Sequence, residues 1–180
     1  PSFSEAKNNS SNPTSQSLMP TIASAICVVC LLLIFFLYLF TYRRKLLDNL
    51  RNVLFFTILM AIIISAAFVL LAYVDAHEYV YLIPFVWAPI IARVFYDSRT
   101  AIFLHIITVS IVSLAVTMPY VFLLTQVLVG IVAVISLRDM TQRAQLAQTA
   151  AFVLISYSLI YTALHVLTAG DWQSINWHFY

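Results

Sequence analysis

Three polar side chains lie inside long apolar stretches of the sequence, where a group that needs hydrogen bonds is costly. They are His105, Gln126 and His165. Ionisable residues inside membrane segments are candidates for ion or proton chemistry. Such a site requires these side chains to converge. The alternative is that each makes an interhelical hydrogen bond, as polar side chains in membrane bundles commonly do. The spacing leaves both interpretations open.

The two cysteines form a CVVC motif, Cys27 and Cys30, inside an apolar run. Zinc or redox chemistry at such a motif requires polar access and, for zinc, further ligands. The sequence has no second cysteine pair. We therefore interpret both residues as small apolar wall residues.

A hydrolytic centre within the membrane would need an activated nucleophile and a base. The two glycines, Gly130 and Gly170, do not begin a GxSx pattern, and the sequence has neither an HExxH motif nor a Gly-rich phosphate loop. We expect the serines to let helices approach or to bond their own backbone. They are Ser65, Ser110, Ser113, Ser136, Ser156 and Ser158. The sequence predicts no catalytic residue, cofactor or metal site in this chain.

The composition identifies the solvent that surrounds these residues. Of 180 residues, 63% are hydrophobic and 9% are charged, whereas a soluble domain has about 25% charged residues. A chain of this length cannot hide so much apolar surface in one core. We predict a lipid bilayer as the partner. The small net charge of +2 gives no reason to expect nucleic acid.

The apolar runs predict an all-α, polytopic membrane bundle. Each run approaches the roughly 20 residues that a transmembrane helix needs, and only helices satisfy the backbone of such spans in lipid. Pro84 and Pro89 should kink or break the third span. Residues 1–17 read as a polar tether, residues 18–170 as the membrane domain and residues 171–180 as an interfacial tail. The six spans are 18–41, 53–74, 80–96, 101–118, 120–137 and 146–168.

The basic residues predict the orientation of these spans. Eight of the nine Lys and Arg residues fall between spans one and two, three and four, or five and six. Basic loops are cytoplasmic under the positive-inside rule, so both ends of the chain should be extracytoplasmic. We accordingly expect an extracytoplasmic region before Pro1 and a further span after Tyr180.

The segment ARVFYDSRTAI should be a cytoplasmic turn between two helices. Asp97 or Ser98 can cap the second helix, and Arg93 can pair with Asp97 four residues later. We predict a cytoplasmic docking edge for a downstream domain, although orientation and lipid headgroup contact explain the same charges. The residues of this predicted edge are Arg93, Asp97, Arg99, Arg138, Asp139 and Arg143.

The segment YVYLIPFVWAP places aromatic residues and two prolines near the outer surface. A broken helix is tolerated where it lines protein or a cavity. A small outer pocket could therefore involve Tyr81, Pro84, Trp87 and Pro89, with ordinary packing as the alternative.

Two segments resemble one membrane family. YLIPFVWAPIIARVFYDSRTAI is similar to its Pro-containing helix that ends in a cytoplasmic D-x-R turn. LLTQVLVGIVAVISLRDMTQRAQLAQTA is similar to its Gly-containing helix, which ends in S-x-R before a basic turn. With a looser match over residues 18–170, the chain resembles the membrane domain of bacterial seven-transmembrane receptors with an intracellular HD hydrolase domain.

The resemblance implies a transmission role in the bacterial inner membrane. Its implied partners are an extracytoplasmic sensor domain, an unknown extracellular ligand and a cytosolic HD domain that hydrolyses cyclic di-AMP with divalent metals. A homodimer is a further option. The HD domain and the sensor domain are not in this sequence, so no catalytic residue of the family transfers to it.

Two other functions fit part of the pattern. A six-helix substrate-binding subunit of a small-molecule importer has the right size, but the outside N-terminus and the scarcity of glycine speak against it. An intramembrane hydrolase lacks a nucleophile and base pair.

Overall fold

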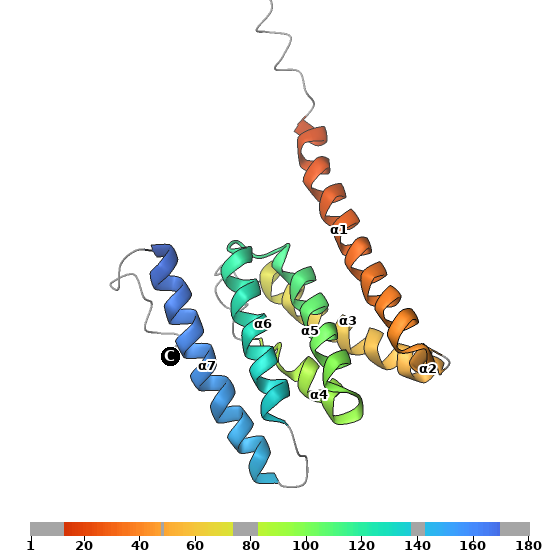
Figure 1. Ribbon diagram of the computed structural model, residues 1–180. Helices are drawn as coiled ribbons and strands as arrows, with labels where there is room; N and C mark the ends of the chain where they lie inside the picture. The colour runs from red at the N-terminus through yellow and green to blue at the C-terminus, as the bar shows by residue number, and fades with distance from the viewer. Residues whose placement is uncertain (1–12, 48, 74–82, 138–142, 170–180) are drawn as a thin grey trace, which may run out of the picture.

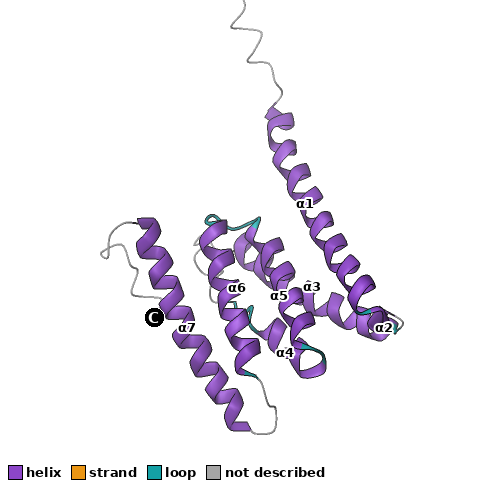
Figure 2. Ribbon diagram, in the orientation of Figure 1, coloured by secondary structure: helices purple, strands orange, loops and turns teal. Residues whose placement is uncertain are grey.

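The computed structural model describes residues 13–47, 49–73, 83–137 and 143–169, and within them every regular element is an α-helix (Figure 2). The all-α prediction is confirmed. In chain order the helices are α1 (Pro13–Tyr42), α2 (Arg44–Leu47), α3 (Leu50–Tyr73), α4 (Trp87–Phe95), α5 (Ser98–Ser113), α6 (Pro119–Ser136) and α7 (Arg143–Ala169). The predicted tether, the outer loop at 74–82, the basic turn at 138–142 and the tail lie largely outside the described residues.

Four of the described helices are long and apolar enough to cross a membrane, rather than the six that the sequence predicted. Their qualifying segments are Met19–Tyr42, Leu50–Ala72, Pro119–Ser136 and Ala147–Leu164. The other two predicted spans correspond to α4 and α5. With 16 residues, α5 reaches about 24 Å at 1.5 Å per residue, short of the roughly 30 Å hydrocarbon core.

Proline chemistry explains the short α4. Pro84 precedes the turn before the helix, and Pro89 occupies the first helical turn, where backbone N–H groups lack intrahelical acceptors. The helix ends at Phe95, because Tyr96 adopts extended dihedral angles of φ −138° and ψ −166°.

The segment after α5 also leads into a proline. A residue before proline is disfavoured in the helical conformation, and Met118, which precedes Pro119, has φ −117° and ψ 76°. The chain leaves the helix at Ser113, whose hydroxyl donates to the carbonyl of Ser110 at 2.8 Å. Residues 114–118 form the turn into α6.

The centre of the bundle is α5, which contacts α1, α3, α4 and α6. It buries apolar side chains on several sides, including Leu104, Val109 and Val112. The first half of α1 extends beyond the other helices, while α7 packs along α6 at the opposite side (Figure 1). Both outer helices expose most of their apolar side chains, as expected where the solvent is lipid.

The serines behave as predicted where hydrogen bonds are described. Ser65 and Ser110 donate to carbonyl groups of their own helices at 2.9 and 2.7 Å. Ser136 of α6 is 3.1 Å from the hydroxyl of Thr149 in α7. These bonds satisfy hydroxyl groups that would be costly if unpaired in lipid.

Candidate functional site

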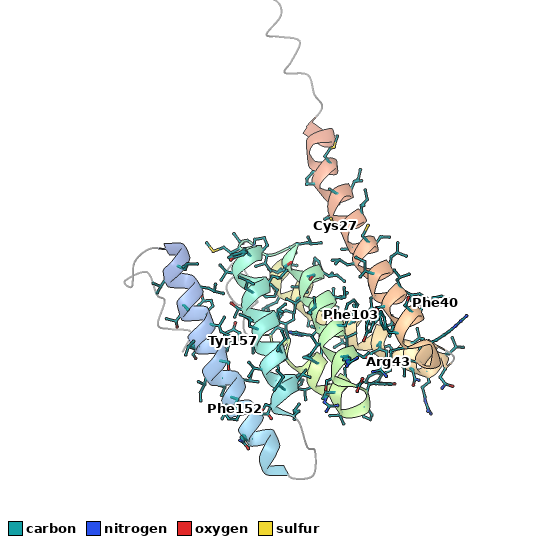
Figure 3. The ribbon with its side chains drawn as sticks, viewed as in Figure 1. Cys27, Phe40, Arg43, Phe103, Phe152 and Tyr157 are labelled. Carbon is teal, nitrogen blue, oxygen red and sulfur yellow. The ribbon has the colours of Figure 1, made fainter. Side chains whose placement is uncertain are left out.

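The turn between α4 and α5 is tied to the end of α1 by an ion pair. Of the two predicted capping residues, Asp97 and Ser98, Asp97 occupies the N-cap position of α5, but its side chain makes no capping hydrogen bond. Its Oδ2 accepts from Nη2 of Arg43, 54 residues earlier in the sequence. Figure 3 shows Arg43 at the end of α1 that lies beside α5. The predicted pairing of Arg93 with Asp97 is wrong, because the extended Tyr96 separates the two residues.

A second bond ties the same turn to α3. The hydroxyl group of Tyr96 donates to Oδ1 of Asn52 at 3.0 Å. The turn therefore has one polar link to α1 and one to α3. We call these four residues, Arg43, Asn52, Tyr96 and Asp97, the helix junction.

Aromatic side chains pack next to the helix junction and join the same helices. Tyr38 of α1 stacks on Phe103 of α5 with ring centroids 4.1 Å apart, and Phe56 of α3 lies 4.6 Å from Tyr96. Such pairs add about 0.5–1.5 kcal/mol each beyond burial. The aromatic cluster comprises Phe35, Tyr38, Phe55, Phe56, Phe95, Tyr96 and Phe103.

This arrangement can couple movements of separate helices. The turn before α5 cannot move relative to α1 or α3 without breaking a polar link or repacking the aromatic cluster. Packed interfaces shift between discrete arrangements rather than deforming continuously. The helix junction is therefore suited to pass a change in helix packing to whatever contacts the turn.

The predicted docking edge is only partly described. Arg99 is exposed, and Arg93 is half-buried with an Nε that has no hydrogen-bond partner in the described structure. Arg138 and Asp139 lie outside the described residues. Arg143 begins α7, but its side chain also lies outside the description.

The predicted outer pocket is likewise partly described. Pro84 and Trp87 are exposed, the latter by 63%, whereas Pro89 is buried against the bundle. Tyr81 lies outside the described residues. The pocket stays a prediction.

Two of the three intramembrane polar residues meet at the α5–α6 interface. Nε2 of His105 donates to the backbone carbonyl of Gln126 at 2.8 Å, since a carbonyl oxygen can only accept. Both side chains are 1% exposed. Gly130 makes this approach possible, because a Cβ there would stand 2.1 Å from the same Nε2. The bond supports the interhelical interpretation of His105. The side chain of His165 lies outside the described residues.

The two cysteines and the metal-binding residue types were the remaining candidates for chemistry. Cys27 and Cys30 are unbonded and exposed on α1, and Figure 3 shows Cys27 on the half of α1 that leaves the bundle. Among the described residues, no three His, Cys, Asp or Glu side chains gather as metal ligands would.

Sequence reasoning missed Asn52 and the bond between Arg43 and Asp97. Arg43 was interpreted only as part of the orientation signal. Asn52 is a polar residue next to the start of a predicted span, and polar residues there commonly form hydrogen bonds with other helices. That position was the available indication of its role.

Comparison with protein families identifies the chain. The family model described as "7TM receptor with intracellular HD hydrolase" matches residues 18–180. No curated protein and no solved structure matches the chain. The match does not favour the importer alternative, and together with the apolar helices it shows a multi-pass membrane protein. The chain belongs to the family of 7TM receptors with an intracellular HD hydrolase.

Proposed function

We propose that this chain is the signal-transmission domain of a receptor-type HD phosphodiesterase, and that the intact protein hydrolyses cyclic di-AMP at a bacterial inner membrane. The family match over residues 18–180 carries the proposal. The divalent metals of the reaction would bind in the HD domain, not in this chain. The chain transmits a signal to the HD domain, and the ligand that starts this signal acts from outside the cell.

The helix junction supplies a physical route for transmission. A ligand shifts an equilibrium between two helix packings only by its differential affinity for them. If α1 changes its position relative to α5, the Arg43–Asp97 pair carries that change to the turn between α4 and α5. This turn holds Arg99, and the predicted docking edge would meet the HD domain there.

The basic loops set the orientation in this proposal. With the arginine-rich turns in the cytoplasm, the helix junction faces the HD domain. The opposite end, which includes residues 114–118 and the predicted outer pocket, faces the sensor domain and the ligand.

The test uses the intact protein, with its HD domain, in proteoliposomes. Hydrolysis of cyclic di-AMP should be measured for the wild type and for a variant with both Asp97→Ala and Arg99→Ala. We expect altered hydrolysis, because the variant loses the link to α1 and one edge charge. Unchanged hydrolysis would remove the docking edge from the account, and no hydrolysis by the wild type would contradict the substrate.

A further inference from the structure

Three arginines at the same end of the bundle have no partner in the described structure. Arg51, Arg93 and Arg99 make no hydrogen bond or ion pair there. By contrast, Arg43 is paired with Asp97, and the Arg44 guanidinium lies 5.0 Å from the centre of the Phe40 ring. The unpaired arginines come from three different helices.

The helix junction links the chain segments that hold these arginines. The bond between Tyr96 and Asn52 joins α4 to α3. Arg51 is the residue next to Asn52, while Arg93 and Arg99 lie three residues before and three residues after Tyr96. The described carboxylate nearest in sequence, Asp97, already binds Arg43. Within the described residues, no further carboxylate is left for these three arginines, so an external anion can bind them there.

The surroundings of the arginines favour an amphiphilic anion. Leu50 and Leu54 flank Arg51 on α3, and Leu50 is 79% exposed. On α4, Val94 and Phe95 follow Arg93, and Phe95 is 67% exposed. Phe55 of α3 contacts Phe95, with ring centroids 5.5 Å apart, so α3 and α4 adjoin at this end. A soluble anion would use the guanidinium groups alone, whereas a lipid would also cover these apolar side chains.

We propose that Arg51, Arg93 and Arg99 bind the phosphate of an anionic phospholipid, whose acyl chains lie on the exposed apolar side chains of α3 and α4. Guanidinium groups bind phosphate through paired N–H donors. Arg51 lies at the beginning of the membrane-spanning segment Leu50–Ala72, at the depth of a headgroup. The inference requires only that the chain lies in a membrane. If it holds, Arg93 and Arg99 contact lipid rather than the HD domain, and the Arg43–Asp97 pair remains as the link to that domain.

The experiment measures lipid binding to the purified protein. The protein is delipidated in a neutral detergent and titrated with dioleoylphosphatidylglycerol or dioleoylphosphatidylcholine, and bound lipids are counted by native mass spectrometry. We expect the phosphatidylglycerol to bind more tightly. Each of Arg51→Gln, Arg93→Gln and Arg99→Gln should weaken its binding by about fivefold, the contribution of one basic residue near an anionic surface.

Arg44→Gln is the matched control, because Arg44 carries the same charge but contacts Phe40. It should change the affinity by less than the other three substitutions. An equal loss in all four variants would indicate diffuse attraction and overturn the site, as would equal binding of both lipids by the wild type. Inorganic phosphate is titrated in parallel, and binding as tight as that of the lipid would assign the arginines to a soluble anion. Thermal unfolding in the same detergent checks that each variant is folded, and Arg→Lys replaces any variant that is not.

Discussion

His105 of α5 lies directly against the backbone of Gly130 in α6. A Cβ at position 130 would stand 2.1 Å from its Nε2 and 2.2 Å from its Cδ2. The same Nε2 donates to the carbonyl of Gln126, one helical turn earlier. The contact fixes the spacing of the two helices at the place where the α1–α5 group of helices meets the α6–α7 pair.

Gly130→Ala should therefore push the two helices apart. Overpacking of this kind typically costs about 1–3 kcal/mol, and we expect a loss of that size in the free energy of unfolding in detergent. The double variant with His105→Ala removes the obstructing ring and should recover part of the loss. Additive effects of the two substitutions would contradict the contact.

His105→Leu should also destabilise the protein through the lost hydrogen bond, by about 0.6 kcal/mol and at most about 1.7 kcal/mol, as for other interhelical bonds in membranes. Gln126→Leu is the informative comparison, because the bond uses the backbone carbonyl of Gln126. That substitution leaves the bond in place. We expect the imidazole nitrogen NMR shifts of His105 to be those of a ring protonated at Nε2 in the wild type and in the Gln126 variant.

Neighbouring phenylalanines on α1 allow a matched test of the aromatic cluster. Phe35 is 6% exposed and lies 6.3 Å from Phe56 between ring centroids, whereas Phe36 is exposed. Phe35→Ala should cost about 3–5 kcal/mol, as for other buried aromatic residues. Phe36→Ala should change the unfolding free energy by about 0.5 kcal/mol or less. Similar losses of unfolding free energy in the two variants would show that α1 does not pack on the bundle through the face that holds Phe35.

The orientation can be tested with single cysteines. In a background with Cys27→Ala and Cys30→Ala, Ser98→Cys places a thiol next to the helix junction, and Thr117→Cys places one in the turn at the other end. A membrane-impermeant maleimide added outside intact cells should label position 117 only. Labelling of position 98 alone would reverse the predicted topology.

Much of the helix content follows from the sequence, because lipid forces each apolar run into a helix. The predicted first two spans at 18–41 and 53–74 nearly coincide with Met19–Tyr42 and Leu50–Ala72. The third and fourth spans were predicted too long, because their ends depend on backbone turns near Pro84 and Pro119. Apolar composition alone does not predict those turns.

The contacts of the candidate site were harder to predict. Arg93 and Asp97 were paired on the assumption that one helix continues through both, and the extended Tyr96 defeats that assumption. The actual partner, Arg43, is distant in sequence and reaches Asp97 only after α1 packs on α5. The approach of His105 to Gln126 similarly depends on tertiary packing. Gly130, the glycine within a predicted span, was the one local indication of this close approach.

The account depends most directly on the link between Arg43 and Asp97. Exposed ion pairs contribute at most about 1 kcal/mol to stability, so Asp97→Arg should leave the protein folded in thermal unfolding. In the intact protein in proteoliposomes, it should nevertheless change the rate of cyclic di-AMP hydrolysis. The exchange variant with Arg43→Asp and Asp97→Arg keeps the net charge of the chain and restores the pair, and we predict that it returns hydrolysis toward the wild-type rate. A rate unaffected by Asp97→Arg, or equally altered in both variants, would contradict transmission through this link.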